Sequence, residues 1–335
     1  MRVAQSPGRK QPTRPRRAAI LRSFSHRSPV GLLIRHTANI RYCYCSPSYG
    51  NTKWSSKKEV DGQANAFGDL RWRRLARSPR HVGGSTPAAD IRRLRAGRSV
   101  QHVCRGALTD LTPSERSIDA NIRVYSNDGK WHPAVDPLDD ATGQIDAVSV
   151  DRQAAVGPGL FFARTISAAS HRPVAVVPCA KGGTTIGRWA PGGGRDTLYG
   201  SWIARIREAG GHVAGILWYQ GESDAEKAPA SAARWRGTFA TIVAAFRADL
   251  KQSRLPIAFV QLSDKPTLDA LRYPSWEVIR QQQMEAGQET RCVTMVPAAG
   301  LPRNSDDLHL STAAQRELGA RLAKAMQTLT HSRCR

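Results

Sequence analysis

The stretch HVAGILWYQGESD, residues 212–224, indicates the fold class of this chain. Its first half is an apolar run, which is typical of a strand buried on both faces of a sheet. Its second half becomes polar at Gln220 and flexible at Gly221, as expected where a strand ends and a loop begins. Open α/β sheets place their chemistry at such strand ends. We therefore expect a functional loop at this position.

Segments with helical and strand patterns alternate on both sides of this stretch. Residues 121–131 are expected to form a strand, a turn and a second strand. The other expected strands are 174–177, 256–262 and 291–296, and the expected helices are one from Gly157 and those at 197–209, 228–250, 274–286 and 311–329. This alternation predicts an α/β fold, a three-layer α/β/α sandwich with a mainly parallel sheet.

Positive charge is concentrated in the first third of the chain. The formal net charge is +23, but residues 1–104 hold 22 lysines and arginines against 4 acidic residues, whereas residues 105–335 hold 28 against 23. The second part therefore has the charge balance of an ordinary globular domain, which we place at residues 105–330. For this domain we expect neither a nucleic-acid nor a membrane partner.

Residues 1–104 lack the pattern of a folded domain. Their arginines are scattered without helical or strand period, and serine, proline and glycine lie between them. Three interpretations are open. The segment is disordered, or it is a basic arm that binds nucleic acid or an anionic surface, or it is translated out of frame.

Cysteine spacing and hydropathy exclude several other classes. None of the six cysteines forms a CxxC pair, so neither a zinc site nor a disulfide framework is predicted, and no metal or cofactor is expected. No apolar run approaches the ~20 residues of a membrane span. The run at 31–34 is too short for a signal-peptide core. Localisation and oligomeric state stay open.

Asp306 and His309 form an Asp-x-x-His pair just before an expected helix. A carboxylate three residues before an imidazole can hold one ring nitrogen and leave the other as a general base. The alternative is an ordinary surface turn. The position of the pair, in a loop between a strand and a helix capped by Ser311 and Thr312, favours the functional interpretation.

Two further segments carry polar groups at the ends of expected strands. Gln220 can donate an amide N–H to a developing oxyanion, and Glu222 can orient its neighbours by hydrogen bonds. Gly182 and Gly183 can offer backbone N–H groups that no side chain obstructs. The alternatives are a buried glutamine with satisfied hydrogen bonds and an ordinary tight turn.

Together these segments resemble a known enzyme family. CAKGGTTIGRW (179–189), WYQGESD (218–224) and DDLHLS (306–311) occur in an order that resembles the SGNH/GDSL hydrolases. The closest resemblance is to their sialate O-acetylesterase-type branch, the acetylesterases of carbohydrate esterase family 6. RVYSNDGKW, PLDD and GPGLFFA resemble the N-terminal half of that family, so the resemblance covers about residues 105–328.

The resemblance implies a three-layer α/β/α hydrolase that removes acetyl groups from sugars through a serine nucleophile, without a metal. His309 would be the base and Asp306 its partner, while Gln220 and a glycine of the pair 182–183 would line the oxyanion hole. The expected partner is an acetylated carbohydrate. Sialate, xylan and other acetylated glycans all remain open as substrates.

The nucleophile of the family is not found at its expected place. In the family it lies in a Gly-Gln-Ser-Asn-Met segment after the first strand, which would fall shortly before Leu108. Here the sequence is AGRSVQHVCRGALTDL (96–111), in which Ser99 follows arginine and precedes valine. Loss of a triad serine lowers turnover about a million-fold in subtilisin. We therefore expect an impaired enzyme in which the first strand is also lost.

Two alternatives to an esterase remain. One is a catalytically inactive relative that keeps a carbohydrate pocket without the nucleophile, and the other is a nucleic-acid-binding protein that acts through the basic arm.

Trp189, Trp218 and Tyr219 lie beside the glycine-rich segments. They could stack on sugar rings, or they could belong to the core.

The genetic code offers a test of the missing motif. Residues 96–103 can be encoded GCC GGC CGG TCA GTC CAA CAT GTG, and these codons, read one nucleotide later, give Pro-Ala-Gly-Gln-Ser-Asn-Met. We therefore predict that residues 1 to about 103 are out of frame. Sequencing the gene across codons 90–110 should reveal the shift. A gene in which no one-base shift there encodes Gly-Gln-Ser contradicts this prediction.

Overall fold

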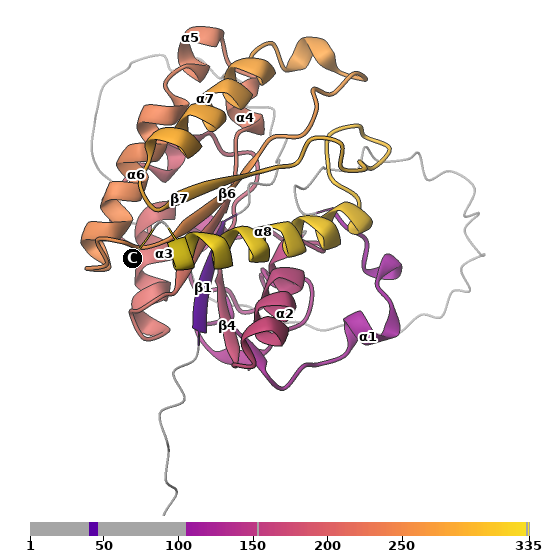
Figure 1. Cartoon of the computed structure of the whole chain (residues 1–335), viewed down its shortest axis with the longest axis vertical. Helices are drawn as coiled ribbons and strands as arrows, with labels where there is room; N and C mark the ends of the chain where they lie inside the picture. Colours follow the sequence, from indigo (N-terminus) through magenta and orange to yellow (C-terminus); the bar gives the residue numbers. More distant parts are fainter. Residues whose placement is uncertain (1–39, 46–104, 153, 333, 335) are drawn as a thin grey trace, which may run out of the picture. The chain divides into compact units, whose positions relative to one another are not determined.

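The computed structural model describes residues 40–45, 105–152, 154–332 and 334 (Figure 1). The described strands are β1 (Ile40–Cys45), β2 (Ile122–Tyr125), β3 (Trp131–Pro133), β4 (Val174–Pro178), β5 (Gly215–Tyr219), β6 (Ile257–Gln261) and β7 (Val293–Pro297). They form one sheet in the order β3-β2-β4-β1-β5-β6-β7. Neighbouring strands are parallel, except that β2 and β3 are antiparallel.

Helices cover both faces of this sheet. They are α1 (Pro113–Arg116), α2 (Pro158–Ser170), α3 (Leu198–Glu208), α4 (Glu222–Ala225), α5 (Pro229–Ala232), α6 (Trp235–Asp249), α7 (Trp276–Glu289) and α8 (Thr312–Ser332), with short 3-10 turns at Leu108–Asp110, Ala147–Ser149, Ile186–Trp189 and Ala270–Arg272. The connections through α3, α6 and α7 all advance in one direction across the sheet. Right-handed crossovers therefore place these three helices on one face.

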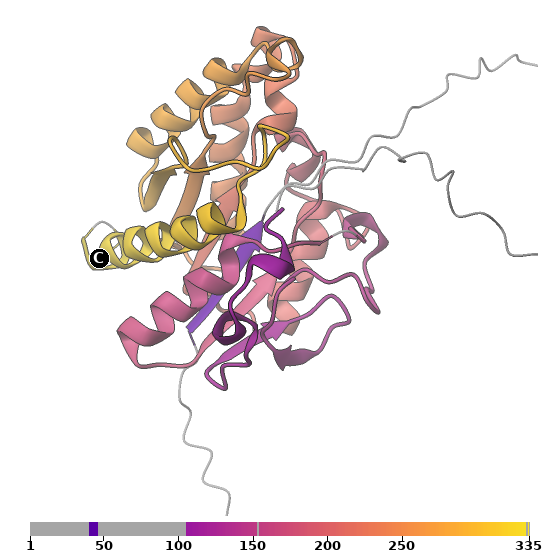
Figure 2. The ribbon, with the colours of Figure 1, turned by 90° about the vertical axis from the view of Figure 1, so that its right-hand side faces the viewer.

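The other face carries α2 and α8, which pack side by side (Figures 1 and 2). The expected fold class, a three-layer α/β/α sandwich with a mainly parallel sheet, is therefore confirmed. No helix in the described part of the chain is long and apolar enough to cross a bilayer.

Strand β1 corrects one expectation. We expected the first strand of the sheet to be lost, but Ile40–Cys45 pairs in parallel with both β4 and β5. The segment IRYCYC is rich in residues that favour strands, and its backbone satisfies the facing edges of two buried strands. The rest of residues 1–104, including Ser99, lies outside the described residues.

From residue 121 onward the expected strands and helices are present, with ends shifted by a few residues. One expectation was wrong, because the single helix at 228–250 is divided into α5 and α6. Pro229 begins α5, and the helix is interrupted before Trp235. The interruption matters for the site, since Trp235 is buried and its indole N–H contacts the end of β5.

Three tryptophans fill the core beneath the glycine-rich loops. The ring centroids of Trp189 and Trp218 are 5.7 Å apart, and those of Trp189 and Trp202 are 5.8 Å apart. All three side chains are fully buried, and Tyr219 is also buried. Of the two interpretations of Trp189, Trp218 and Tyr219, the structure therefore favours the core over a platform for sugar rings.

Gly319 allows α8 to approach α2 closely. A Cβ atom at this position would lie 2.6 Å from Cβ of Phe161 and 2.7 Å from the carbonyl oxygen of Pro158. The second neighbour is a backbone atom, so no rotation of a flexible side chain can relieve the contact. A larger residue would force the two helices apart.

We predict that Gly319→Ala lowers the free energy of unfolding by about 1–3 kcal/mol, the usual cost of overpacking. Gly237→Ala is the matched control, because a Cβ atom at this position in α6 meets nothing within 4 Å. It should not lower stability, since alanine favours a helix more than glycine does. Urea unfolding followed by circular dichroism measures both variants. Wild-type stability of Gly319→Ala would contradict the close packing of α2 and α8.

Candidate active site

The carboxyl ends of the parallel strands form the candidate site. Strands β4 and β5 flank β1, and the chain passes over β1 to connect them, so the strand order reverses at this point. In open α/β sheets ligands bind outside the carboxyl ends of the strands at such a reversal. Gly182 and Gly183 follow β4, Gln220 and Glu222 follow β5, and the Asp306–His309 pair follows β7.

Hydrogen bonds tie the loops of this edge to one another. The backbone N–H of Ser275, after β6, donates to the carbonyl of Ala225, after β5, at 3.0 Å. The backbone N–H of Gly300, after β7, donates to the carboxylate of Asp264, after β6, at 2.8 Å. The three loops are thereby held as one unit, which fixes the side chains that they carry.

Asp306 holds His309 by its side chain and its backbone. Oδ2 of Asp306 lies 2.7 Å from Nδ1 of His309, and Oδ1 accepts the backbone N–H groups of Leu308 at 3.1 Å and of His309 at 2.9 Å. The imidazole is only 3% exposed, and its Nε2 has no hydrogen-bond partner among the described residues. This arrangement favours the tautomer with a proton on Nδ1 and leaves Nε2 as an acceptor.

Burial and neighbouring charges set the protonation of this pair. Burial alone would raise the pKa of Asp306, but the hydrogen bonds from His309 outweigh it and hold the pKa well below its usual range. Burial lowers the pKa of His309; Asp306 opposes this change, while the guanidinium groups of Arg105 and Arg272 reinforce it. A carboxylate beside a neutral imidazole is the state that a general base requires. Sequence analysis missed both arginines, because no motif connects them with Asp306.

Gln220 is fully buried at the end of β5, and its side chain is fully hydrogen-bonded. Its amide nitrogen donates to the carbonyl of Thr184 at 3.0 Å and to the carboxylate of Asp224. Its amide oxygen accepts the indole N–H of Trp235 at 2.9 Å. An oxyanion donor needs a free N–H directed at the substrate. As placed, Gln220 has none, so the structure does not support the expected direct role.

Asp224 was missed by the sequence analysis although it lies in the WYQGESD motif. One of its carboxylate oxygens accepts the Gln220 amide and also the backbone N–H of Ile186, the latter at 2.9 Å. The loops after β4 and β5 are therefore joined through a single carboxylate. The available signal was spacing, because Asp224 lies four residues after Gln220 and the short helix α4 connects them.

Glu222 begins α4 and is only 5% exposed. Burial raises the pKa of Glu222 to about 7. Its Oε2 atom and the hydroxyl of the neighbouring Ser223 have no partner in the part of the chain that the structure describes. Buried carboxyl groups with a shifted pKa are enriched in functional sites, although structural networks also contain them. The expected orienting role of Glu222 therefore remains a prediction.

The two glycines after β4 differ in what they can offer. Gly183 has a φ of +65°, in the left-handed region that favours glycine. The backbone N–H of Gly182 donates to the carboxylate of Asp151 at 3.3 Å. No acceptor for the N–H of Gly183 is present among the described residues. Of the expected oxyanion donors, Gly183 therefore keeps a backbone N–H available.

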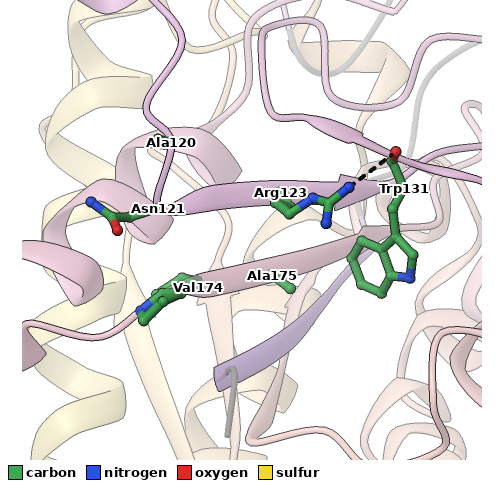
Figure 3. Close-up of a pocket in the computed structure, with 7 residues that line it drawn as sticks. Ala120, Asn121, Arg123, Trp131, Val174 and Ala175 are labelled. Atoms are coloured by element: carbon green, nitrogen blue, oxygen red, sulfur yellow. Dashed lines mark hydrogen bonds between the residues drawn. The ribbon is translucent and has the colours of Figure 1, made fainter. Parts of the chain in front are cut away.

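The described residues were also searched for a metal site and for other pockets. No group of three or more His, Cys, Asp or Glu side chains in the described ranges could hold a metal ion. A pocket of about 140 Å³ lies at β2, β3 and β4, and Arg123, Trp131 and Ala175 are among the residues that line it (Figure 3). None of the candidate site residues lines this pocket.

The sequence matches a protein-family model over residues 96–328. That family is described as carbohydrate esterase, sialic acid-specific acetylesterase. The probable carbohydrate esterase At4g34215 of Arabidopsis thaliana is 33% identical over 231 residues, which represent 67% of this chain and 81% of the plant protein.

One solved structure gives a similar result. The X-ray structure of the Arabidopsis thaliana protein AT4G34215 matches with a TM-score of 0.56 and 31% identity, covering 66% of this chain and 87% of that chain. The crystal structure of XAC1771, a carbohydrate acetylesterase from Xanthomonas citri, matches with a TM-score of 0.49 and 23% identity. The match covers 65% of this chain and 51% of that chain.

The matched region contains each of the candidate site residues described above. Membership of this family implies an acetylated carbohydrate as the substrate class. The chain therefore belongs to the carbohydrate esterases of the sialic acid-specific acetylesterase family, and its domain is that of an ester hydrolase.

Proposed function

We propose that Asp306 and His309 are the base side of a serine esterase site that removes O-acetyl groups from sugars. One observation carries this proposal. Asp306 fixes Nδ1 of His309, while Nε2 is buried and has no partner among the described residues. A serine hydroxyl would lose its proton to Nε2 as its oxygen attacks the acetyl carbonyl, and Asp306 would stabilise the imidazolium.

The second half of the reaction uses the same groups. The imidazolium returns its proton to the departing sugar oxygen, which leaves an acetyl group on the serine. His309 then takes a proton from water as that water attacks the acetyl-enzyme, and it returns this proton to the serine oxygen as acetate is released. The backbone N–H of Gly183 stabilises the oxyanion formed in each step.

Gln220 acts through other residues in this scheme. It holds the carbonyl of Thr184, and its partner Asp224 holds the backbone of Ile186. Both contacts fix the loop that presents Gly183. Gln220 is therefore a positioning residue, and Glu222 is proposed to orient its neighbours by hydrogen bonds.

The nucleophile lies outside the described residues. The family match begins at residue 96 and so includes Ser99, while Ser46 and Ser48 directly follow β1 in the sequence. In the family the first strand leads directly into Gly-Gln-Ser, whereas here residues 46–95 separate β1 from the start of the match. We therefore propose that a frame-restored Gly-Gln-Ser, rather than one of these three serines, completes the site.

The absence of Gly-Gln-Ser also favours a second candidate, a catalytically inactive relative that binds acetylated carbohydrates. The two candidates share Asp306 and His309, so only turnover separates them.

For the domain itself we propose neither a nucleic-acid nor a membrane partner, since residues 105–335 carry a net charge of only +5.

We predict that a chain in which Pro-Ala-Gly-Gln-Ser-Asn-Met replaces residues 96–103 releases acetate from O-acetylated sugars. His309→Asn in this chain should lower kcat/KM by about 10²–10⁴-fold, because the general base is lost. His331→Asn, at an exposed position near the end of α8, is the control and should leave kcat/KM unchanged.

Two outcomes would contradict parts of this scheme. Acetate release by the restored chain that does not exceed the His309→Asn level would contradict the esterase mechanism. If the chain as written releases acetate as fast as the restored chain, and this release depends on His309, then the claim that the chain lacks its nucleophile is contradicted instead. Ser46→Ala, Ser48→Ala and Ser99→Ala would then identify which serine is the nucleophile.

We predict that Gln220→Leu lowers the free energy of unfolding by about 1–3 kcal/mol, because the buried indole N–H of Trp235 loses its partner. Gln281→Ala is the control, since Gln281 is exposed and its amide donates to Glu285. Its effect should stay within about 0.5 kcal/mol. Urea unfolding measures both variants. Full stability of Gln220→Leu, together with loss of turnover when the same change is made in the frame-restored chain, would favour a direct oxyanion role over the positioning role.

A further inference from the structure

Arg105 is fixed next to the Asp306–His309 pair. Its carbonyl oxygen accepts the side-chain amide of Asn304 at 3.1 Å. The following residue, Gly106, exchanges two backbone hydrogen bonds with Val156, at 3.0 and 3.1 Å. The first contact holds the backbone of Arg105 against the loop that carries Asp306 and His309, and the second fixes the adjacent residue to Val156.

The Arg105 side chain reaches the carboxylate of the base pair. Its Nη1 atom lies 3.4 Å from Oδ2 of Asp306, the same oxygen that lies 2.7 Å from Nδ1 of His309. The side chain is only 18% exposed. Its Nε and Nη2 atoms are buried and have no hydrogen-bond partner among the described residues. A desolvated guanidinium thus faces one carboxylate, and that carboxylate is the partner of His309.

We propose that Arg105 is a positioning residue of the esterase site, which holds the Asp306 carboxylate against His309 and shares its negative charge. This inference rests on the proposed role of His309 as the base. The guanidinium and the imidazole compete for the same oxygen. When both are positively charged they repel each other, so Arg105 favours the neutral form of His309, which is the form that accepts a proton from serine.

Three charged groups act on His309, and they come from different segments. Asp306 lies in its own loop and favours the imidazolium, whereas Arg105 and Arg272 disfavour it. Arg272 is already compensated, because its Nε donates to the carboxylate of Glu226. Arg105 has no acidic partner besides Asp306 among the described residues. Removal of Arg105 should therefore change the protonation of His309 more than removal of Arg272.

The test is a histidine NMR titration of the full chain, which requires no turnover. The Cε1–H signal of His309 is identified by its absence from the spectrum of His309→Asn. In Arg105→Met we expect the titration midpoint of His309 to move to higher pH than in wild type, because a positive charge is lost and Asp306 is left unshared. In Arg105→Lys the midpoint should return toward the wild-type value.

Arg303→Met is the matched control. Arg303 lies in the loop that carries Asp306 and His309, and its side chain is 18% exposed, as is that of Arg105. Its Nη2 atom, however, pairs with Asp307 at 2.8 Å rather than with Asp306. Its replacement should leave the His309 midpoint unchanged. An equal shift in Arg105→Met and Arg303→Met would overturn the proposal, because it would show a general effect of net charge.

Folding and turnover do not decide this test. Removing one partner of an ion pair destabilises a protein when it leaves the other charge uncompensated. Asp306 keeps its contacts with the His309 ring and with two backbone N–H groups, so Arg105→Met is expected to fold. If circular dichroism shows that it does not, Arg105→Gln provides the neutral side chain and should shift the midpoint in the same direction. A wild-type midpoint in the folded neutral variant overturns the role of Arg105. It leaves the esterase proposal intact, because that proposal depends on acetate release.

Discussion

The reversal of strand order at β1 is the constraint on which the site depends. Because β4 and β5 flank β1, the loops that follow these strands must meet at one edge of the sheet. Asp224 joins the two loops through its carboxylate. His309, the proposed base, lies in the loop after β7, which is an edge strand of the sheet. The chain then enters α8, which packs on α2. A strand at the β1 position is therefore needed to place the loops after β4 and β5 beside each other.

The buried polar groups at this end of the sheet differ in how many hydrogen-bond partners they have. Oδ1 and Oδ2 of Asp306 together face two backbone N–H groups, the His309 ring and the Arg105 guanidinium. These contacts offset the cost of removing the carboxylate from water. Nε2 of His309 has no such partner in the described part of the chain. A buried acceptor left unpaired lowers stability, and active sites commonly retain such groups because the reaction uses them.

The sequence predicted the sandwich and the Asp306–His309 contact, because both depend on local pattern: alternating apolar segments and a three-residue spacing. It did not predict β1, since a six-residue strand in an arginine-rich segment has no neighbouring pattern to support it. It assigned Gln220 to the oxyanion because the residue is polar at a strand end. Two of its three partners, Thr184 and Trp235, are distant in sequence. Arg105 was missed for the same reason, since 201 positions separate it from Asp306.

The central proposal is that Asp306 and His309 form the base side of an esterase site whose serine a frame-restored chain would supply. Labelling with a serine-directed fluorophosphonate, followed by mass spectrometry of the labelled peptides, tests this claim most directly. We predict a phosphonate on the serine of Gly-Gln-Ser in the restored chain, absent from its His309→Asn variant and from the chain as written. Labelling that is independent of His309, or a His309-dependent label on a serine within residues 105–335, would contradict it.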